Sequence, residues 1–206
     1  MTTDHLVPAD ISDLYEVHEW RNAVGILTTA CVDEWAEIQT TLRVFRLLQS
    51  EVTAAGGNRS SIVERLERPL KDMGWVERHF QTSIVVDGHA TDSPTHSVDC
   101  FKGRVALEVE WNNKDPFYDR DLNNFRLLFD LQVIDVGVII TRCSELQTIF
   151  NGLGKGSSYG NSTTHMGKLL PRLRGGSGGG CPIVVFGIGP RLYIEDKPLP
   201  QGELSP

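Results

Sequence analysis

Three acidic side chains lie close together in the sequence, around a stretch of β-forming residues. The stretch RVALEVEWNN, residues 104–113, places Glu108 and Glu110 two positions apart, so in a strand both point to the same face. Asp99 precedes this strand, and an antiparallel turn at Lys-Gly would bring it near Glu108. Carboxylates gathered at a strand end suit a hard cation such as Mg²⁺, which can activate a water molecule. The alternative is a solvent-exposed strand face with ordinary surface ion pairs.

The elements around these acids are predicted to alternate between helices and strands. Apolar residues at helical spacing predict a helix from Asp33 to about Val52, and Ser60 or Ser61 can cap a second helix over 62–74. Further strands are expected at 82–88, 98–101, 104–111, 135–141 and 182–188, further helices at 117–132, 144–150 and 166–174, and a loop at 90–97. This order predicts an α/β sandwich with a mixed central sheet flanked by helices.

The chain length fits one domain, residues 1–206, in which 1–30 form an N-terminal arm or a short helix and 195–206 a flexible tail. The four scattered cysteines indicate reduced thiols in a cytoplasmic protein, and no apolar run resembles a signal peptide or a membrane span. Gly156 separates Lys155 from Ser157, so the stretch GLGKGSS is not a phosphate-binding P-loop.

The charge distribution allows two interpretations. The net charge of −7 argues against a nucleic-acid partner. However, residues 151–194 contain no Asp or Glu, although Lys155, Lys168, Arg172, Arg174 and Arg191 lie there. Such a segment could form a phosphate-contacting surface, or a Gly-rich, apolar stretch could simply lack acids.

The flanks of the acidic strand carry a resemblance to a known family. The stretch VDCFKGRVALEVEWNNKDPF, followed by IDVGVIIT, resembles the core of the BglII/BstYI group of type II restriction endonucleases, which have the PD-(D/E)XK nuclease fold. The resemblance covers about residues 30 to 190. It implies a homodimeric enzyme that uses Mg²⁺ to hydrolyse DNA phosphodiesters at a short palindrome, leaving 5′-phosphate ends. Many relatives recognise a GATC core, and a cognate DNA methyltransferase is the usual functional partner.

The resemblance also implies roles for the acids. Asp99 and Glu108 match the metal-binding pair. Glu110 stands where the wider fold has lysine and this group has glutamine. The resemblance implies that Glu110 is a catalytic proton acceptor or a further metal ligand, and that lysine's positive charge is missing or supplied elsewhere. Glu64 or Glu67 is a candidate for a further acid from the preceding helix.

Candidates for DNA contact follow from the same resemblance and from the acid-free segment. The turn after the catalytic strand, Asn112, Asn113 and Lys114, matches the group's recognition turn. The further candidates are Lys155, Ser157, Ser158, His165, Arg172 and Arg174. The helix over 119–133 is expected to contribute to the dimer interface, although its Phe125, Leu128 and Phe129 could equally be core.

Three other functions stay open at this stage. A repair or nicking nuclease, or a DNA-binding protein without catalysis, would share the fold. A glycosidase-like enzyme could also use paired carboxylates, but aromatic residues make up only 8% of the chain, and sugars need stacking platforms.

Overall fold

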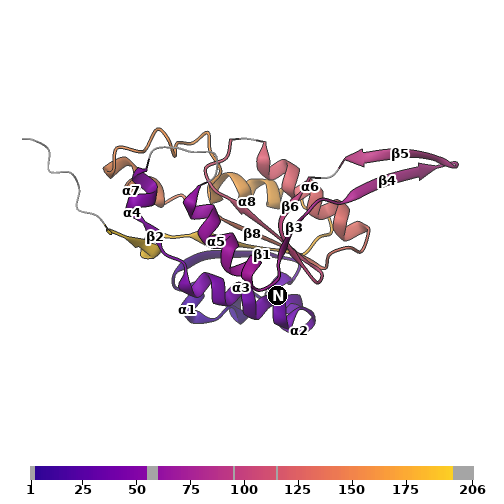
Figure 1. The fold of residues 1–206 in the computed structure, drawn as a ribbon, viewed down its shortest axis with the longest axis horizontal. Helices are drawn as coiled ribbons and strands as arrows, with labels where there is room; N and C mark the ends of the chain where they lie inside the picture. The colour runs from indigo at the N-terminus through magenta and orange to yellow at the C-terminus, as the bar shows by residue number, and fades with distance from the viewer. Residues whose placement is uncertain (1–2, 55–59, 95, 115, 197–206) are drawn as a thin grey trace, which may run out of the picture.

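The computed structural model describes residues 3–54, 60–94, 96–114 and 116–196, which build a six-stranded mixed sheet with helices on both faces (Figure 1). This confirms the predicted fold class. The strand order is β1–β9–β8–β7–β6–β3, in which β7, β8 and β9 are parallel and the other pairings are antiparallel. The bounds are β1 (Tyr15–Trp20), β9 (Ile183–Ile188), β8 (Val136–Arg142), β7 (Val105–Glu110), β6 (Val98–Lys102) and β3 (Val76–Arg78).

Two helical layers enclose the sheet. One face carries α2 (Ala23–Ala30), α3 (Val32–Val44), α5 (Ser61–Asp72) and α7 (Leu146–Gly152), and the other carries α6 (Phe117–Asp130) and α8 (Met166–Arg174) (Figure 1). Every residue of β8 is buried, as expected for a β-branched strand covered on both sides. Phe125 and Leu128 of α6 are fully buried in the core, so the apolar stripe of this helix is not a free interface.

The first 30 residues, for which the sequence predicts an irregular arm or a short helix, contain short helices and also a strand. Tyr15–Trp20 forms the edge strand β1, paired along its whole length with β9, and it is preceded by η1 (Asp4–Leu6) and α1 (Ala9–Ser12). Only Tyr15 of this strand is fully buried, because an edge strand can keep Glu and His side chains partly in water.

The predicted helix over 33–52 is too long. Helix α3 ends at Val44, and Phe45 takes an extended conformation. The chain then forms β2 (Leu47–Leu48), which pairs in parallel with β10 (Tyr193–Ile194), and the short helix α4 (Gln49–Thr53). Burial of Leu47 in the core outweighs the helical spacing of this segment. The expected turn after it lies mostly at 55–59, outside the described residues.

Helix α5 begins as predicted. The Ser60 hydroxyl accepts a hydrogen bond from Ile62 N–H, so Ser60 is the N-cap. At the other end of the chain, η2 (Pro190–Leu192) and β10 precede Asp196. The Asp196 carboxylate accepts a hydrogen bond of 2.8 Å from Ser50 N–H. Residues 197–206 of the expected tail lie outside the described part of the chain.

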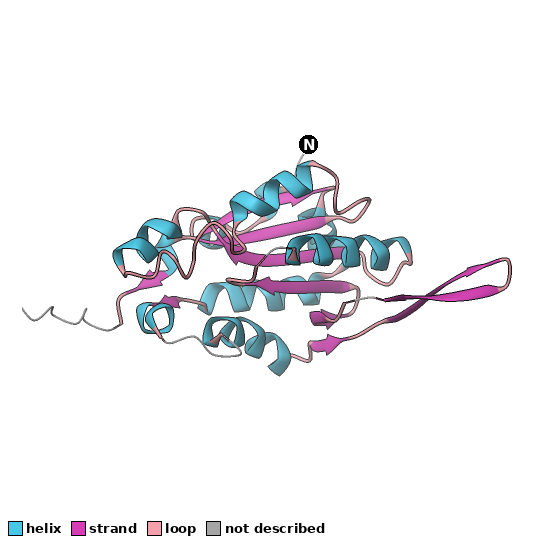
Figure 2. Ribbon diagram, turned by 90° about the horizontal axis from the view of Figure 1, so that it is seen from above, coloured by secondary structure: helices cyan, strands magenta, loops and turns pink. Residues whose placement is uncertain are grey.

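The expected loop at 90–97 is a strand over most of its length. Strand β4 (Gln81–Val86) pairs with β5 (His89–Pro94), and the hairpin projects from the body of the molecule (Figure 2). Asp87 and Gly88 both have positive φ, at 49° and 80°, as the two central residues of a tight hairpin turn require. Among the described helices, none has both the length and the apolar character needed to cross a membrane.

Candidate active site

Strands β6 and β7 separate where Asp99 and Glu108 meet. Their ladder ends at the pairing of Cys100 with Leu107. Beyond it, Asp99 N–H donates to Glu108 Oε2 at 3.2 Å, and Val109 N–H donates to Asp99 Oδ2 at 3.1 Å. Carboxylate oxygens therefore accept the backbone hydrogen bonds at this fork and fix both carboxyl groups. The prediction that the turn brings Asp99 to Glu108 is confirmed.

The face that carries Glu108 and Glu110 is not exposed to solvent. These side chains are 1% and 2% exposed, respectively, and they point away from the core that holds Leu107 and Val109. They lie beside Asp121 of α6, which is fully buried. The alternative of a solvated strand face is therefore wrong, and the site contains one carboxylate more than the sequence reasoning named.

The sequence reasoning missed Asp121, although a signal for it exists. Tyr118, Asp121, Leu122 and Phe125 follow one another at three- and four-residue steps, so Asp121 falls on the apolar stripe of α6. A carboxylate on a buried stripe needs a partner, and here the partner is Glu110 of the neighbouring strand.

Burial governs the protonation of these acids. Loss of solvent, followed by repulsion from Asp99 and Asp121, raises the pKa of Glu108 well above its usual value. Burial and the neighbouring Asp121 raise the pKa of Glu110 to about 9. Burial also raises the pKa of Asp121 to about 6, against the lowering effect of its hydrogen bond with Glu110. At neutral pH Glu110 is thus the protonated member of the pair and donates to Asp121.

The donor set suits a hard divalent cation. The ligands on offer are carboxylate oxygens from Asp99 and Glu108, the atoms that Mg²⁺ prefers. Glu108 Oε1 is buried and has no hydrogen-bond partner among the described residues, although a buried carboxylate oxygen normally has one. A cation there would satisfy this atom and offset the like charges that raise the pKa values.

One cation of the protein already lies beside the acids. The Arg120 guanidinium is 3.3 Å from Asp121 Oδ1 and 3.8 Å from Glu110 Oε1, and it packs over the Phe117 ring. Its side chain is 36% exposed, so it lies at the border between the buried acids and solvent. Arg120 therefore supplies positive charge at the mouth of the site.

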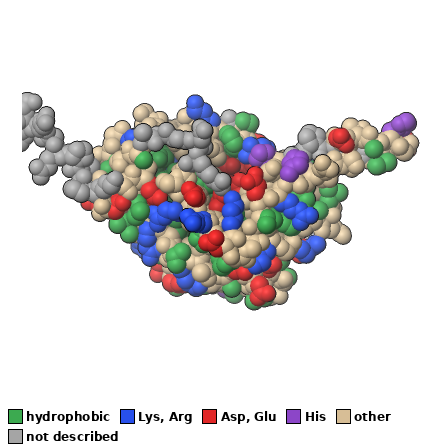
Figure 3. Space-filling view, in the orientation of Figure 1, with side chains coloured by type: hydrophobic (Ala, Val, Ile, Leu, Met, Phe, Trp, Pro, Cys, Tyr) green, Lys and Arg blue, Asp and Glu red, His purple; other side chains and the backbone are tan. Residues whose placement is uncertain are grey.

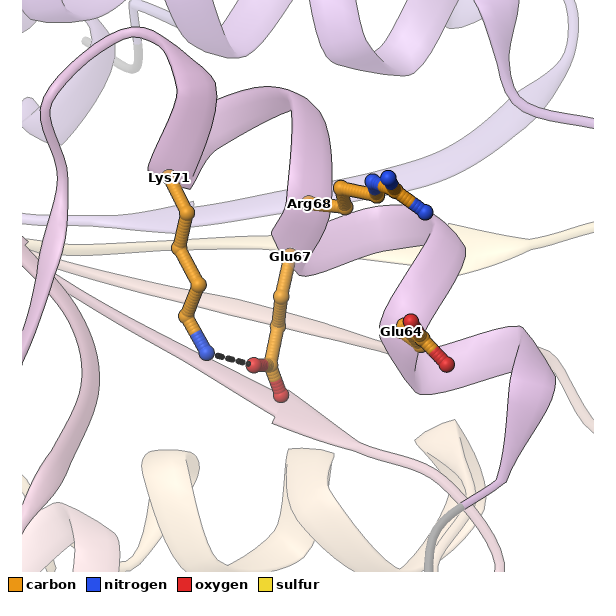
Figure 4. Close-up of a pocket in the computed structure, with 4 residues that line it drawn as sticks. All are labelled: Glu64, Glu67, Arg68 and Lys71. Carbon is orange, nitrogen blue, oxygen red and sulfur yellow. Dashed lines mark hydrogen bonds and ion pairs between the residues drawn. The ribbon is translucent and has the colours of Figure 1, made fainter.

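The two acids proposed from helix α5 differ in burial. Glu67 is buried and forms an ion pair of 2.5 Å with Lys71, whereas Glu64 is exposed. Both line a pocket of about 300 Å³ together with Arg68 and Lys71 (Figure 4). Helix α5 packs on the sheet face opposite to the Glu108 side chain, in the same core cluster as Cys100 of β6.

The predicted recognition turn contacts the acid-free segment. Asn112 has a positive φ of 60°, which turns the chain out of β7. Lys114 forms an isolated antiparallel bridge with Thr163, and Asn113 exchanges hydrogen bonds with Thr164. The structure thus brings the turn and the loop over 156–165 together, next to the acids.

The remaining DNA-contact candidates are spread more widely. Ser157 and Ser158 are exposed, and Lys155 and His165 are half-buried. Arg172 forms an ion pair of 2.9 Å with Asp119 of α6, so its charge is partly compensated.

Arg174 lies apart from the other candidates. It lines a second pocket together with Ile183, and Ile183 lies at the opposite end of the parallel strands from Glu110. On the face seen in Figure 3, acidic, basic and histidine side chains are mixed, so that face is not uniformly positive.

A second group of possible metal ligands lies at the end of β8. Ligand atoms of Glu16, Cys143 and Glu145 lie within 4.8 Å of one another. This set includes a thiol, which suits softer metals than Mg²⁺. It is therefore a poor match for the cation expected at Asp99 and Glu108.

Comparison with protein families shows which family the sheet and the acidic site match. Residues 15–188 match the model of the restriction endonuclease BglII/BglIII family, which spans all six strands of the sheet and the acidic site. A search of curated proteins finds no match to this chain.

Proposed function

Because the chain belongs to the restriction endonuclease BglII/BglIII family and is a type II restriction endonuclease, which hydrolyses DNA phosphodiesters, we propose that it uses Mg²⁺ to cut both strands of a short palindrome. Cleavage leaves 5′-phosphate ends, and the site has a GATC core. The observation that carries the proposal is the fork at which Asp99 and Glu108 accept hydrogen bonds from each other's strands, with Glu108 Oε1 left without a partner.

The residues of the site have distinct roles in this proposal. Asp99 and Glu108 hold the cation, which when bound activates the attacking water and stabilises the leaving oxygen. Val109 N–H keeps the Asp99 carboxylate in place. Positive charge bound at the site would lower the pKa of Glu110 and release its own proton, so that Glu110 can accept a proton from the water, as a glutamine could not. Arg120 supplies the positive charge that lysine supplies elsewhere in the fold.

DNA recognition is assigned to the turn and loop beside the acids. Asn112, Asn113 and Lys114 lie directly after the catalytic strand, and amide side chains can read adenine edges in the major groove. Ser157, Ser158, Lys155, His165 and Arg172 contribute further base or phosphate contacts, and Arg174 contacts phosphates further out. A palindromic site requires a two-fold symmetric homodimer, and a cognate methyltransferase protects the host DNA.

The test is cleavage of phage and plasmid DNA by the purified protein. With Mg²⁺ the protein should give discrete bands, and sequencing of their ends should identify one palindrome with 5′-phosphates. Asp99→Ala and Glu108→Ala should abolish cleavage, and Glu110→Gln should keep metal binding while slowing the chemical step. Glu77→Gln, at an exposed position of β3, is the control and should cut like the wild type.

The other outcomes identify the rival functions. Intact DNA with wild-type protein across several divalent metals and substrates refutes the proposal. Binding in Mg²⁺ without hydrolysis indicates a DNA-binding protein, and smeared or structure-dependent products indicate a repair or nicking nuclease.

A further inference from the structure

Arg142, at the end of β8, is buried although it carries a charge. It is 1% exposed, and its guanidinium lies 5.5 Å from the Phe150 ring centroid. Its Nη2 donates to the Tyr159 carbonyl at 2.7 Å and the Gly160 carbonyl at 3.4 Å, and to Thr163 Oγ1 at 3.3 Å. In the described part of the chain no carboxylate forms an ion pair with it. Burying a guanidinium without a negatively charged partner costs free energy of folding. The contacts between Arg142 and this loop therefore call for an explanation beyond packing.

The loop that Arg142 holds is docked on the turn after the catalytic strand. Thr164 N–H donates to the Asn113 carbonyl at 2.8 Å, and Asn113 N–H donates to Thr164 Oγ1 at 3.2 Å. The bridge between Thr163 and Lys114 lies next to these bonds. The position of the turn therefore depends on the position of the loop.

The same turn holds one of the site acids. Asn113 Nδ2 donates to Glu110 Oε2 at 2.8 Å. Glu110 in turn lies directly opposite Thr141, the residue before Arg142, because β7 and β8 are paired neighbours. Hydrogen bonds therefore link Arg142 to the loop over 159–164, the loop to Asn113 and Asn113 to Glu110, and the chain itself joins Thr163 to Thr164.

We propose that Arg142 and the loop over 159–164 are positioning groups that orient Glu110 through Asn113. The inference rests on the proposed function, since it assigns Glu110 to catalysis. The loop also carries or adjoins Ser157, Ser158 and His165, which are proposed to contact DNA. Seating of the loop on the correct sequence thus sets the orientation of Glu110, and recognition is coupled to cleavage.

A purely structural loop would behave differently from a positioning loop. Loss of packing lowers stability and weakens DNA binding, but it does not slow the chemical step selectively. A positioning loop lowers the cleavage rate while the affinity for DNA stays the same. The two roles can therefore be separated by measuring rate and affinity on the same variants.

The experiment is a double-mutant cycle between Thr164→Val and Asn113→Ala. Valine keeps the shape of Thr164 but removes the oxygen that accepts from Asn113 N–H. Single-turnover cleavage is measured on the site found by end sequencing, and the Kd for the same DNA is measured in EDTA. Thr148→Val, at an exposed position of α7, is the matched control.

The expected result is that Thr164→Val slows cleavage by about 10-fold while its Kd changes by less than about 3-fold. The double variant should be no slower than Asn113→Ala alone, because both changes interrupt the same path. Arg142→Lys, which keeps the charge but loses the planar fork, should also slow cleavage at unchanged Kd if thermal melting shows that it folds.

The opposite results overturn the inference. Multiplied effects in the double variant, or a wild-type rate for a folded Thr164→Val, would show that the loop does not act through Asn113. If the wild type cuts and Glu108→Ala does not, such a result refutes only this inference. If the wild type does not cut at all, the proposed function fails and the inference fails with it.

Discussion

Replacement of Glu110 by glutamine should stabilise the metal-free protein at alkaline pH. Glutamine has the shape of the protonated carboxyl group, so it can accept from Asn113 Nδ2 and donate to Asp121 as Glu110 does. It cannot ionise. Glu110→Gln therefore removes the cost of keeping a buried acid protonated while the hydrogen bonds of the site stay in place.

The magnitude follows from the pKa of Glu110, which burial and Asp121 raise from 4.5 to about 9. Because this pKa is raised on folding, the stability linked to it is fully present below pH 4.5 and is lost as the pH rises towards 9. At pH 8 the loss reaches about 5 kcal/mol, at about 1.4 kcal/mol per pH unit. Relaxation around the site relieves part of it, so we expect a gain of about 2 kcal/mol for the variant, or about 4–8 °C in Tm.

The assay is thermal and urea unfolding in EDTA at pH 5 and pH 8, for the wild type, Glu110→Gln and the control Glu77→Gln. Glu77 is exposed on β3, so its replacement should change stability little at either pH. The stabilisation by Glu110→Gln should be large at pH 8 and small at pH 5. A variant that is no more stable than the wild type at pH 8, or equally stabilised at both pH values, would refute the reasoning.

Two further predictions concern the cation and the core. Mg²⁺ at about 100 times its Kd should stabilise the wild type by about 2.7 kcal/mol at pH 8, and by less at pH 6, where protons compete for the carboxylates. In melting curves, Glu108→Gln should lose this Mg²⁺-dependent shift in Tm. An undiminished shift in this variant would contradict a cation site at Glu108. Gly137→Ala should destabilise the protein by about 1–3 kcal/mol, because the added Cβ would lie 2.4 Å from Phe125 Cδ2. The control is Gly152→Ala, whose added Cβ has no neighbour within 4 Å among the described residues, apart from its own helix and chain neighbours. Equal Tm values for the two variants would contradict this packing.

The parts of the fold predicted correctly from the sequence have strong local patterns. Strand β8 is a continuous β-branched run, and α8 has exactly the predicted bounds because apolar residues mark one face and glycines follow it. The errors arose where distant contacts decide. The edge strand β1 is defined by its pairing with β9, in which Glu16 pairs with Gly187, 171 positions further along the chain. Strand β2 is likewise defined by its pairing with β10.

The acids of the site also differ in whether local sequence predicts their position. Asp99 and Glu108 are joined by one turn, so their approach follows from local sequence. Asp121 reaches them from a helix, and only the packing of α6 against β7 shows that it meets Glu110. The link from Arg142 to Asn113 depends on a loop without regular secondary structure, and periodicity carries no information about such a loop.

Asp121 gives a physical account of the glutamate at position 110, where the resemblance noted in the sequence leads us to expect glutamine. A protonated Glu110 presents a donor to Asp121 and an acceptor to Asn113, so before any cation binds it makes the contacts that glutamine would make. Unlike an amide, it can still lose its proton when positive charge enters the site, because such charge lowers the pKa of nearby carboxyl groups. The substitution therefore keeps the geometry of the amide and adds a proton acceptor, at the cost of stability in the metal-free protein. Arg120, 3.8 Å from Glu110 Oε1, limits that cost at the solvent side.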